Sequence, residues 1–106
     1  MGCRLRRMSR MRSQGERVGE VAQGPELRQE LMRAVDLALA GDWESAHGIV
    51  QKHEDDATAC WVHAVLHKIE GDESNSRYWY RRSSQAYEAY AEPKVELAAI
   101  KAALGY

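Results

Sequence analysis

The residues that could carry chemistry are concentrated in the stretch 60–70, which reads CWVHAVLHKIE. Cys60, His63 and His67 follow one another at spacings of three and four, so they share one face of a helix. His63 and His67 lie one turn apart, which places their Cβ atoms about 6 Å from each other. Imidazole and thiolate groups at this spacing can chelate a transition-metal ion. Glu70 lies one turn beyond His67 and is a further potential ligand.

A fourth ligand could come from His53, which ends the preceding helix and is expected to approach the start of this one if the helices stack. The candidate ligand- or metal-binding set is therefore His53, Cys60, His63 and His67. Neither H-E-x-x-H nor a C-x-x-C pair accompanies it. In a structural interpretation, the two helical histidines fill core positions instead. They then hydrogen-bond a neighbouring carbonyl or the hydroxyl of Tyr78 or Tyr80.

A third interpretation gives the histidines an acid–base role, since an imidazole titrates near neutral pH. The sequence shows no nucleophile with a base positioned to activate it. No catalytic residue is assigned for this reason, and no cofactor and no resident metal are predicted. The protein is expected to be non-enzymatic.

Charge and composition narrow the range of partners. The net charge of −1 is unevenly distributed, because residues 1–24 carry six arginines and two glutamates. The remaining residues carry 9 basic and 14 acidic side chains (15 − 6 and 16 − 2). A mildly acidic body disfavours nucleic-acid binding, and no apolar run approaches the roughly 20 residues that span a membrane. Two cysteines make no disulfide framework, so a cytoplasmic location is expected.

The elements that must position these residues are helices. Residues 1–24 lack apolar periodicity and are expected to form a disordered basic tail, followed by a helical-repeat domain over residues 25–106. Pro25 opens the first helix and Gly41 ends it. The second helix ends near residue 52 or 53, the third covers about 57–70, the fourth ends between 85 and 90, and the fifth covers about 93–104. The predicted class is all-α, with about five helices.

An internal repeat with a spacing of 30 underlies this pattern. Residues 31–42 (LMRAVDLALAGD) align with residues 61–72 (WVHAVLHKIEGD), and each segment ends in a Gly–Asp pair. A period of this length with helix–turn–helix content is typical of a solenoid of helix pairs. In each pair Asp42 or Asp72 is expected to cap the following helix, and Asp55 or Asp56 to cap the third helix. The chain is thus predicted to hold two degenerate helix–turn–helix repeats and a C-terminal capping helix.

Small residues in register, Ala34 with Ala64 and Ala46 with Ser76, together with the Gly–Asp turns, resemble the pattern of tetratricopeptide-type repeats. The motif from Trp61 to Trp79, W-x-H-A-x-x-H-x-x-E-G-D-x-x-N-x-x-Y-W, also resembles one found in small bacterial proteins without an established activity. The first resemblance implies stacked helix pairs, and the second implies a bacterial, cytoplasmic setting.

In such a stack, the first helix of each pair lines the concave side. We name the apolar residues expected there the concave face: Leu31, Val35, Leu39, Trp61, Val65 and Ile69. An apolar face this large on so short a chain is expected to bind a partner. The sequence therefore favours a protein-interaction module that binds a protein or peptide segment, or a second copy of itself. The alternative is a small metal- or ligand-binding protein, conceivably an enzyme, centred on His63 and His67.

Overall fold

The computed structural model describes residues 18–105, with side chains from Gly24 onward. Five α-helices and one short 3-10 helix follow one another along these residues: α2 (Val18–Leu39), α3 (Trp43–Val50), α4 (Ala57–Glu70), α5 (Glu73–Arg82), η2 (Tyr87–Ala89) and α6 (Pro93–Ala103). Residues 18–105 contain no strand. The predicted all-α class with about five helices is confirmed. None of these helices is long and apolar enough to cross a bilayer.

The Gly–Asp pairs form the turns that join α2 to α3 and α4 to α5. Gly41 and Gly71 have φ angles of 92° and 88°, a region where a side chain is strained and glycine is not. The aspartate that follows each glycine, Asp42 or Asp72, accepts a hydrogen bond from the backbone N–H three residues on. Asp56 caps α4 in the same way. These caps are the predicted ones, and they start α3, α4 and α5 at fixed residues.

Two helix ends differ from the prediction. Helix α2 begins at Val18 and continues through Pro25, so residues 18–24 form its first turns and not part of a tail. A proline inside a helix removes one backbone hydrogen bond, and α2 continues past that loss. Residues 1–17, the rest of the segment expected to be disordered, lie outside the described residues. Helix α5 ends at Arg82, before the predicted range, and an irregular stretch containing η2 leads to α6.

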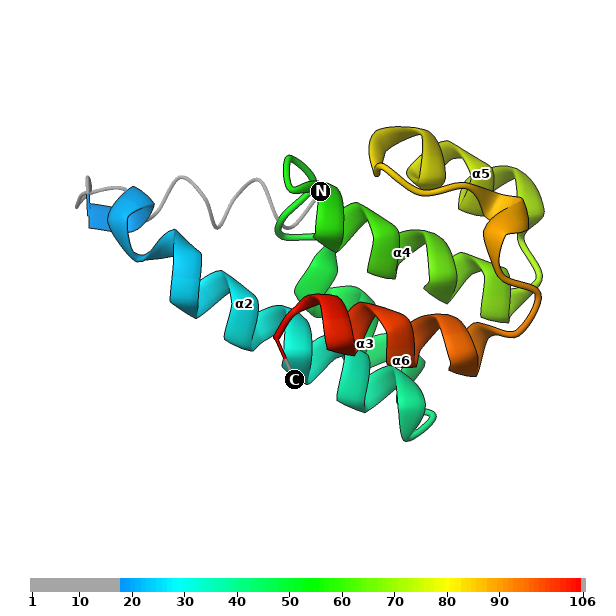
Figure 1. Ribbon diagram of the computed structural model, residues 1–106, viewed down its shortest axis with the longest axis horizontal. Coiled ribbons are helices and arrows are strands. Elements are labelled where there is room, and N and C mark those ends of the chain that lie inside the picture. Colours follow the sequence, from blue (N-terminus) through cyan, green and yellow to red (C-terminus); the bar gives the residue numbers. More distant parts are fainter. Residues whose placement is uncertain (1–17, 106) are drawn as a thin grey trace.

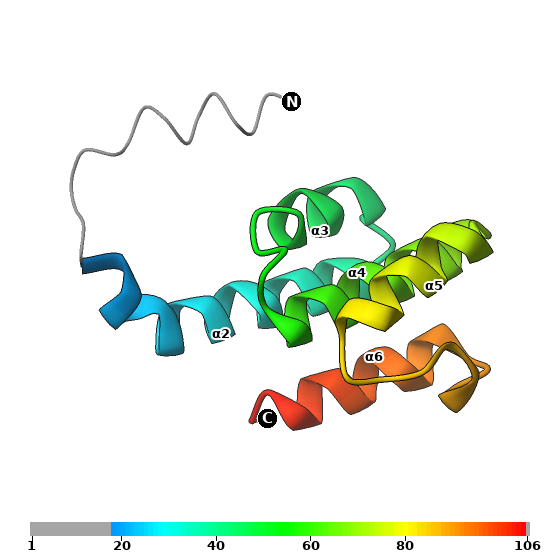
Figure 2. The ribbon, with the colours of Figure 1, turned by 90° about the horizontal axis from the view of Figure 1, so that it is seen from above.

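Helices α2 and α4 contact each other and both α3 and α6, while the first turns of α2 extend beyond the other helices (Figure 1). Helix α3 packs on both of them from one side, and α5 packs along α4. Helix α6 also packs on both α2 and α4, but on the side opposite to α3 (Figure 2). The C-terminal helix therefore returns along α2 and α4 and does not extend the stack.

This return covers most of the concave face. Leu31, Val35, Trp61 and Val65 are at most 8% exposed and belong to one core cluster with the apolar residues of α6. The expectation that they form an open apolar surface was wrong, because the position of α6 depends on tertiary packing and not on a local pattern. Of the other two residues of that face, Leu39 is half-buried, whereas Ile69 is 44% exposed.

A buried carboxylate, that of Glu96, connects α6 to α4 and α5 through hydrogen bonds and an ion pair. Glu96 is fully buried, and its side chain accepts hydrogen bonds from Trp61 Nε1 at 2.8 Å and from the Tyr80 hydroxyl at 2.6 Å. Its other oxygen lies 2.9 Å from the ammonium of Lys68, which is itself buried. Burial and the Glu96 carboxylate both raise the pKa of Tyr80. Since every group here has a partner, the charge is accommodated and α6 has a defined register on α4 and α5.

Candidate metal-binding site

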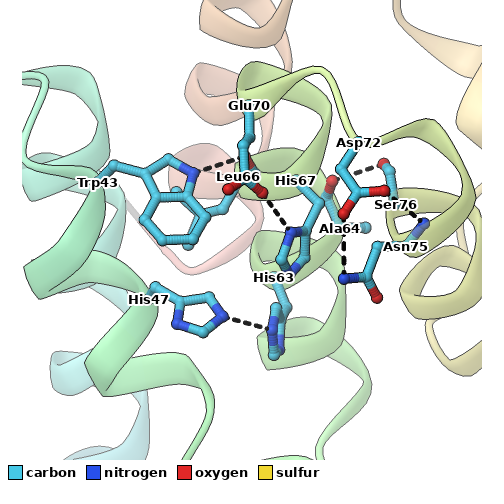
Figure 3. Close-up of polar contacts among 10 residues, drawn as sticks. All are labelled: Trp43, His47, His63, Ala64, Leu66, His67, Glu70, Asp72, Asn75 and Ser76. Carbon is cyan, nitrogen blue, oxygen red and sulfur yellow. Dashed lines mark hydrogen bonds and ion pairs between the residues drawn. The ribbon is translucent and has the colours of Figure 1, made fainter.

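Three histidines meet between α3 and α4 (Figure 3). His47 comes from α3, while His63 and His67 come from consecutive turns of α4. One ring nitrogen from each residue lies within 4.8 Å of the other two. Between His47 and His63 the two Nε2 atoms are 3.0 Å apart. We call these three residues the histidine cluster.

The start of α3 determines where His47 lies. Trp43, the first residue of α3, donates a hydrogen bond from its indole N–H to the carbonyl oxygen of Leu66 at 2.6 Å. The same indole stacks on the His47 ring, with ring centroids 4.7 Å apart and an interplanar angle of 10°. Because Leu66 directly precedes His67 on α4, this anchor brings His47 next to the histidines of α4.

His63 is the most enclosed member of the histidine cluster. The residue is only 3% exposed. Trp79 of α5 stacks on its ring, with the two ring centroids 3.9 Å apart. Its Nδ1 is the buried side-chain nitrogen or oxygen that has no hydrogen-bond partner among the described residues. A buried N–H without an acceptor is rarer than an acceptor without a donor. We therefore infer that Nδ1 of His63 carries no proton. The proton of the neutral ring is then on Nε2, which donates a hydrogen bond to Nε2 of His47.

His67 is held by a carboxylate. Its Nδ1 lies 2.9 Å from Oε1 of Glu70, the last residue of α4. An ionised carboxylate only accepts hydrogen bonds, so His67 must donate its Nδ1–H there. In a neutral imidazole the other nitrogen, Nε2, then has a free lone pair.

Burial favours the neutral forms of His63 and His47. Burial and, to a smaller extent, charge repulsion from His47 and His67 lower the pKa of His63 to about 3. The pKa of His47 is also lowered, first by burial and then by His67, against an opposing effect of Glu70. The neutral form of imidazole is the form that binds a metal ion. At neutral pH neither His47 nor His63 therefore has to release a proton to water before it binds a metal ion.

The spacing of the three rings suits a small divalent ion. Zinc–nitrogen bonds of 2.0–2.1 Å in a tetrahedral site place the ligand atoms about 3.3 Å apart. The observed 3.0 Å between the Nε2 atoms of His47 and His63 is close to that spacing, and no two of the three ligand atoms are more than 4.8 Å apart. Imidazole nitrogen suits zinc, copper and nickel better than calcium or magnesium, which prefer oxygen. Three nitrogens leave at least one coordination position for water.

The two other predicted ligands lie elsewhere. His53 pairs through Nε2 with Glu30 Oε1 at 2.9 Å, and Cys60 donates from Sγ to the Glu54 carbonyl oxygen at 3.3 Å. Neither belongs to the histidine cluster, so their predicted place in one ligand set with His63 was wrong. Burial also raises the pKa of the Cys60 thiol, which disfavours the thiolate that metals bind.

The expected structural partners of the helical histidines were also wrong. The hydroxyl of Tyr80 binds Glu96, and the partners of His63 and His67 are His47 and Glu70. His47 is the ligand that the sequence did not reveal, because it lies in a different helix from the other two. The available signal was its position one turn after Trp43, on the inward face of the second helix.

Comparisons with protein-family models, with curated proteins and with solved structures found no match for this chain.

Proposed function

We propose that this protein binds one divalent transition-metal ion through His47, His63 and His67. The observation that carries the proposal is the convergence of three imidazoles from two helices, with one nitrogen of each within 4.8 Å of the others. Zinc, copper(II) and nickel(II) are the ions that such a ligand set favours. With three protein ligands, water completes the coordination.

Metal binding should be measured on protein purified without a histidine tag and treated with a chelator. Titration calorimetry with Zn²⁺, Ni²⁺ or Cu²⁺ should give one ion per chain. The absorption of the Co²⁺ complex should report tetrahedral coordination with nitrogen ligands. Bound ion should also raise the melting temperature, since an ion that binds only the folded chain stabilises it.

A matched pair of variants locates the site. H47Q removes a ligand from the half-buried edge of the histidine cluster, and H53Q removes a histidine outside it. H47Q should weaken binding by more than the roughly 10–100-fold that the loss of an outer partner costs. H53Q should bind as the unchanged chain does. A protein that binds none of these ions would refute the proposal, and so would equal binding by H47Q.

The architecture supports a second candidate function, a helical-repeat interaction module of tetratricopeptide-like type. The observation that favours it is the apolar face formed by α2 and α4, on which the helix α6 packs. The partner would be a protein or peptide segment or a second copy of the chain. Ile69 is the residue of the concave face that is exposed to such a partner without any movement of α6. If the chain self-associates there, light scattering should show a dimer that I69E disrupts. A monomer at all concentrations, or a dimer unaffected by I69E, contradicts self-association through this face.

A further inference from the structure

Glu70 stands out among the acidic residues because its partner is a histidine of the metal-binding cluster. Its carboxylate accepts the Nδ1–H of His67 at 2.9 Å, on the side of the ring that faces away from His63 (Figure 3). The hydrogen bond leaves Nε2 as the His67 nitrogen with a free lone pair. Glu70 thus determines which nitrogen of His67 is available to an ion.

The other cluster histidine of α4 has no such support. His63 Nδ1 is buried without a partner, and its Nε2 faces His47. To bind an ion through Nε2, His63 must move its proton to Nδ1, where no described residue accepts it. His67 needs no such rearrangement, because Glu70 already holds the proton on Nδ1. Of these two rings, His67 is the one already prepared for metal binding.

We propose that Glu70 is the positioning residue of the metal site: it fixes the tautomer and orientation of His67 and thereby sets the affinity for the ion. This inference rests on the proposed metal-binding function. Carboxylates that hold a ligating histidine by its second nitrogen have this effect in metal sites, and their loss reduces affinity about 10–100-fold. The carboxylate also places one negative charge beside a site whose three ligands are neutral. Its side chain is 47% exposed, so it can be replaced without opening the core.

Two substitutions separate the hydrogen bond from the charge. E70Q keeps an oxygen that can accept the Nδ1–H of His67 but has no charge, whereas E70A removes both. E73A serves as the control, because Glu73 is an exposed acid three residues on that pairs with Arg77 outside the histidine cluster. Zn²⁺ affinity should fall about 10–100-fold in E70A, less than about tenfold in E70Q, and not measurably in E73A.

The tautomer of His67 gives a readout in the metal-free protein. Two-dimensional ¹⁵N NMR of the imidazole rings should show His67 protonated on Nδ1 in the unchanged chain and in E70Q. In E70A it should show a population protonated on Nε2. Unchanged affinity in E70A, equal losses in E70A and E70Q, or the same tautomer in all variants would each overturn the positioning role. If the unchanged chain binds no ion, the proposed function fails, and the NMR result still decides whether Glu70 sets the tautomer.

Discussion

Acidification should destabilise the metal-free protein through His63. The folded chain lowers the pKa of this residue from 6.5 to about 3, chiefly by burying the ring. Above pH 6.5 the imidazole is neutral in both the folded and the unfolded chain, and it has no effect on the pH dependence of stability. Between about pH 6.5 and pH 3 the unfolded chain binds a proton that the folded chain does not, so stability falls as the pH falls.

The size of the effect follows from the pKa shift. Each pH unit within this window costs about 1.4 kcal/mol for one such group. From about pH 7 to about pH 5 the loss from His63 is at most about 2 kcal/mol, because the first part of that range lies above its unfolded pKa. His47 acts in the same direction, since its pKa is lowered as well. Against the roughly 5–10 kcal/mol that stabilise a domain of this size, the loss is large.

Urea unfolding of chelator-treated protein, followed by circular dichroism at a series of pH values, measures this slope. H63F is the informative variant, because a phenyl ring can still stack on Trp79 but cannot bind a proton. The slope of H63F should be smaller than that of the unchanged chain by at most about 1.4 kcal/mol per pH unit. If both proteins lose stability equally between about pH 6.5 and pH 5, His63 is not the group that resists protonation, and the account of its burial is incorrect.

Four further substitutions test other parts of the fold by urea unfolding. E96A should destabilise the chain by about 3–5 kcal/mol, because it leaves the buried Lys68 ammonium without a counter-charge, hydrogen-bonded only to the carbonyl oxygens of Tyr87 and Tyr90. A loss below about 1 kcal/mol would mean that the ion pair between Lys68 and Glu96 contributes little to stability. W43F should cost about 1 kcal/mol through the lost hydrogen bond to the Leu66 carbonyl, and an unchanged midpoint would contradict that bond. G71A should lower the free energy of unfolding by about 1–2 kcal/mol, because Gly71 has a φ of 88°. G48A should raise it by about 0.5–1 kcal/mol, because Gly48 lies inside α3 and no atom lies within 4 Å of an added Cβ. The same sign for both changes would refute the backbone argument.

The sequence predicted the helices well because their ends are marked by local chemistry. The glycines that adopt a positive φ and the aspartates that cap the next helix are recognisable without any tertiary information. Helix α4 occupies the predicted residues 57–70 for this reason. The one-turn spacing of His63 and His67 follows from the helix alone, and both residues are indeed in the candidate site.

The contributions that the sequence did not predict are those that depend on how helices pack. His47 reaches the site only because Trp43 is anchored to the carbonyl of Leu66. Glu96 is fully buried, which is rare for a glutamate, because donors from α4 and α5 surround it. The concave face was expected to be open for the same reason: local patterns do not show where α6 goes.

The return of α6 along both α2 and α4 also has a consequence for folding. In an open solenoid each repeat contacts only its neighbours, so repeats can form or melt one at a time. Here contacts join the two ends of the described chain, since Lys101 pairs with Asp36 and Arg28 donates to the carbonyl oxygen of Leu104. Neither helix pair can complete its core until α6 has arrived. The chain should therefore fold and unfold in a single cooperative step, with amide exchange in α2, α4 and α6 governed by one common free energy.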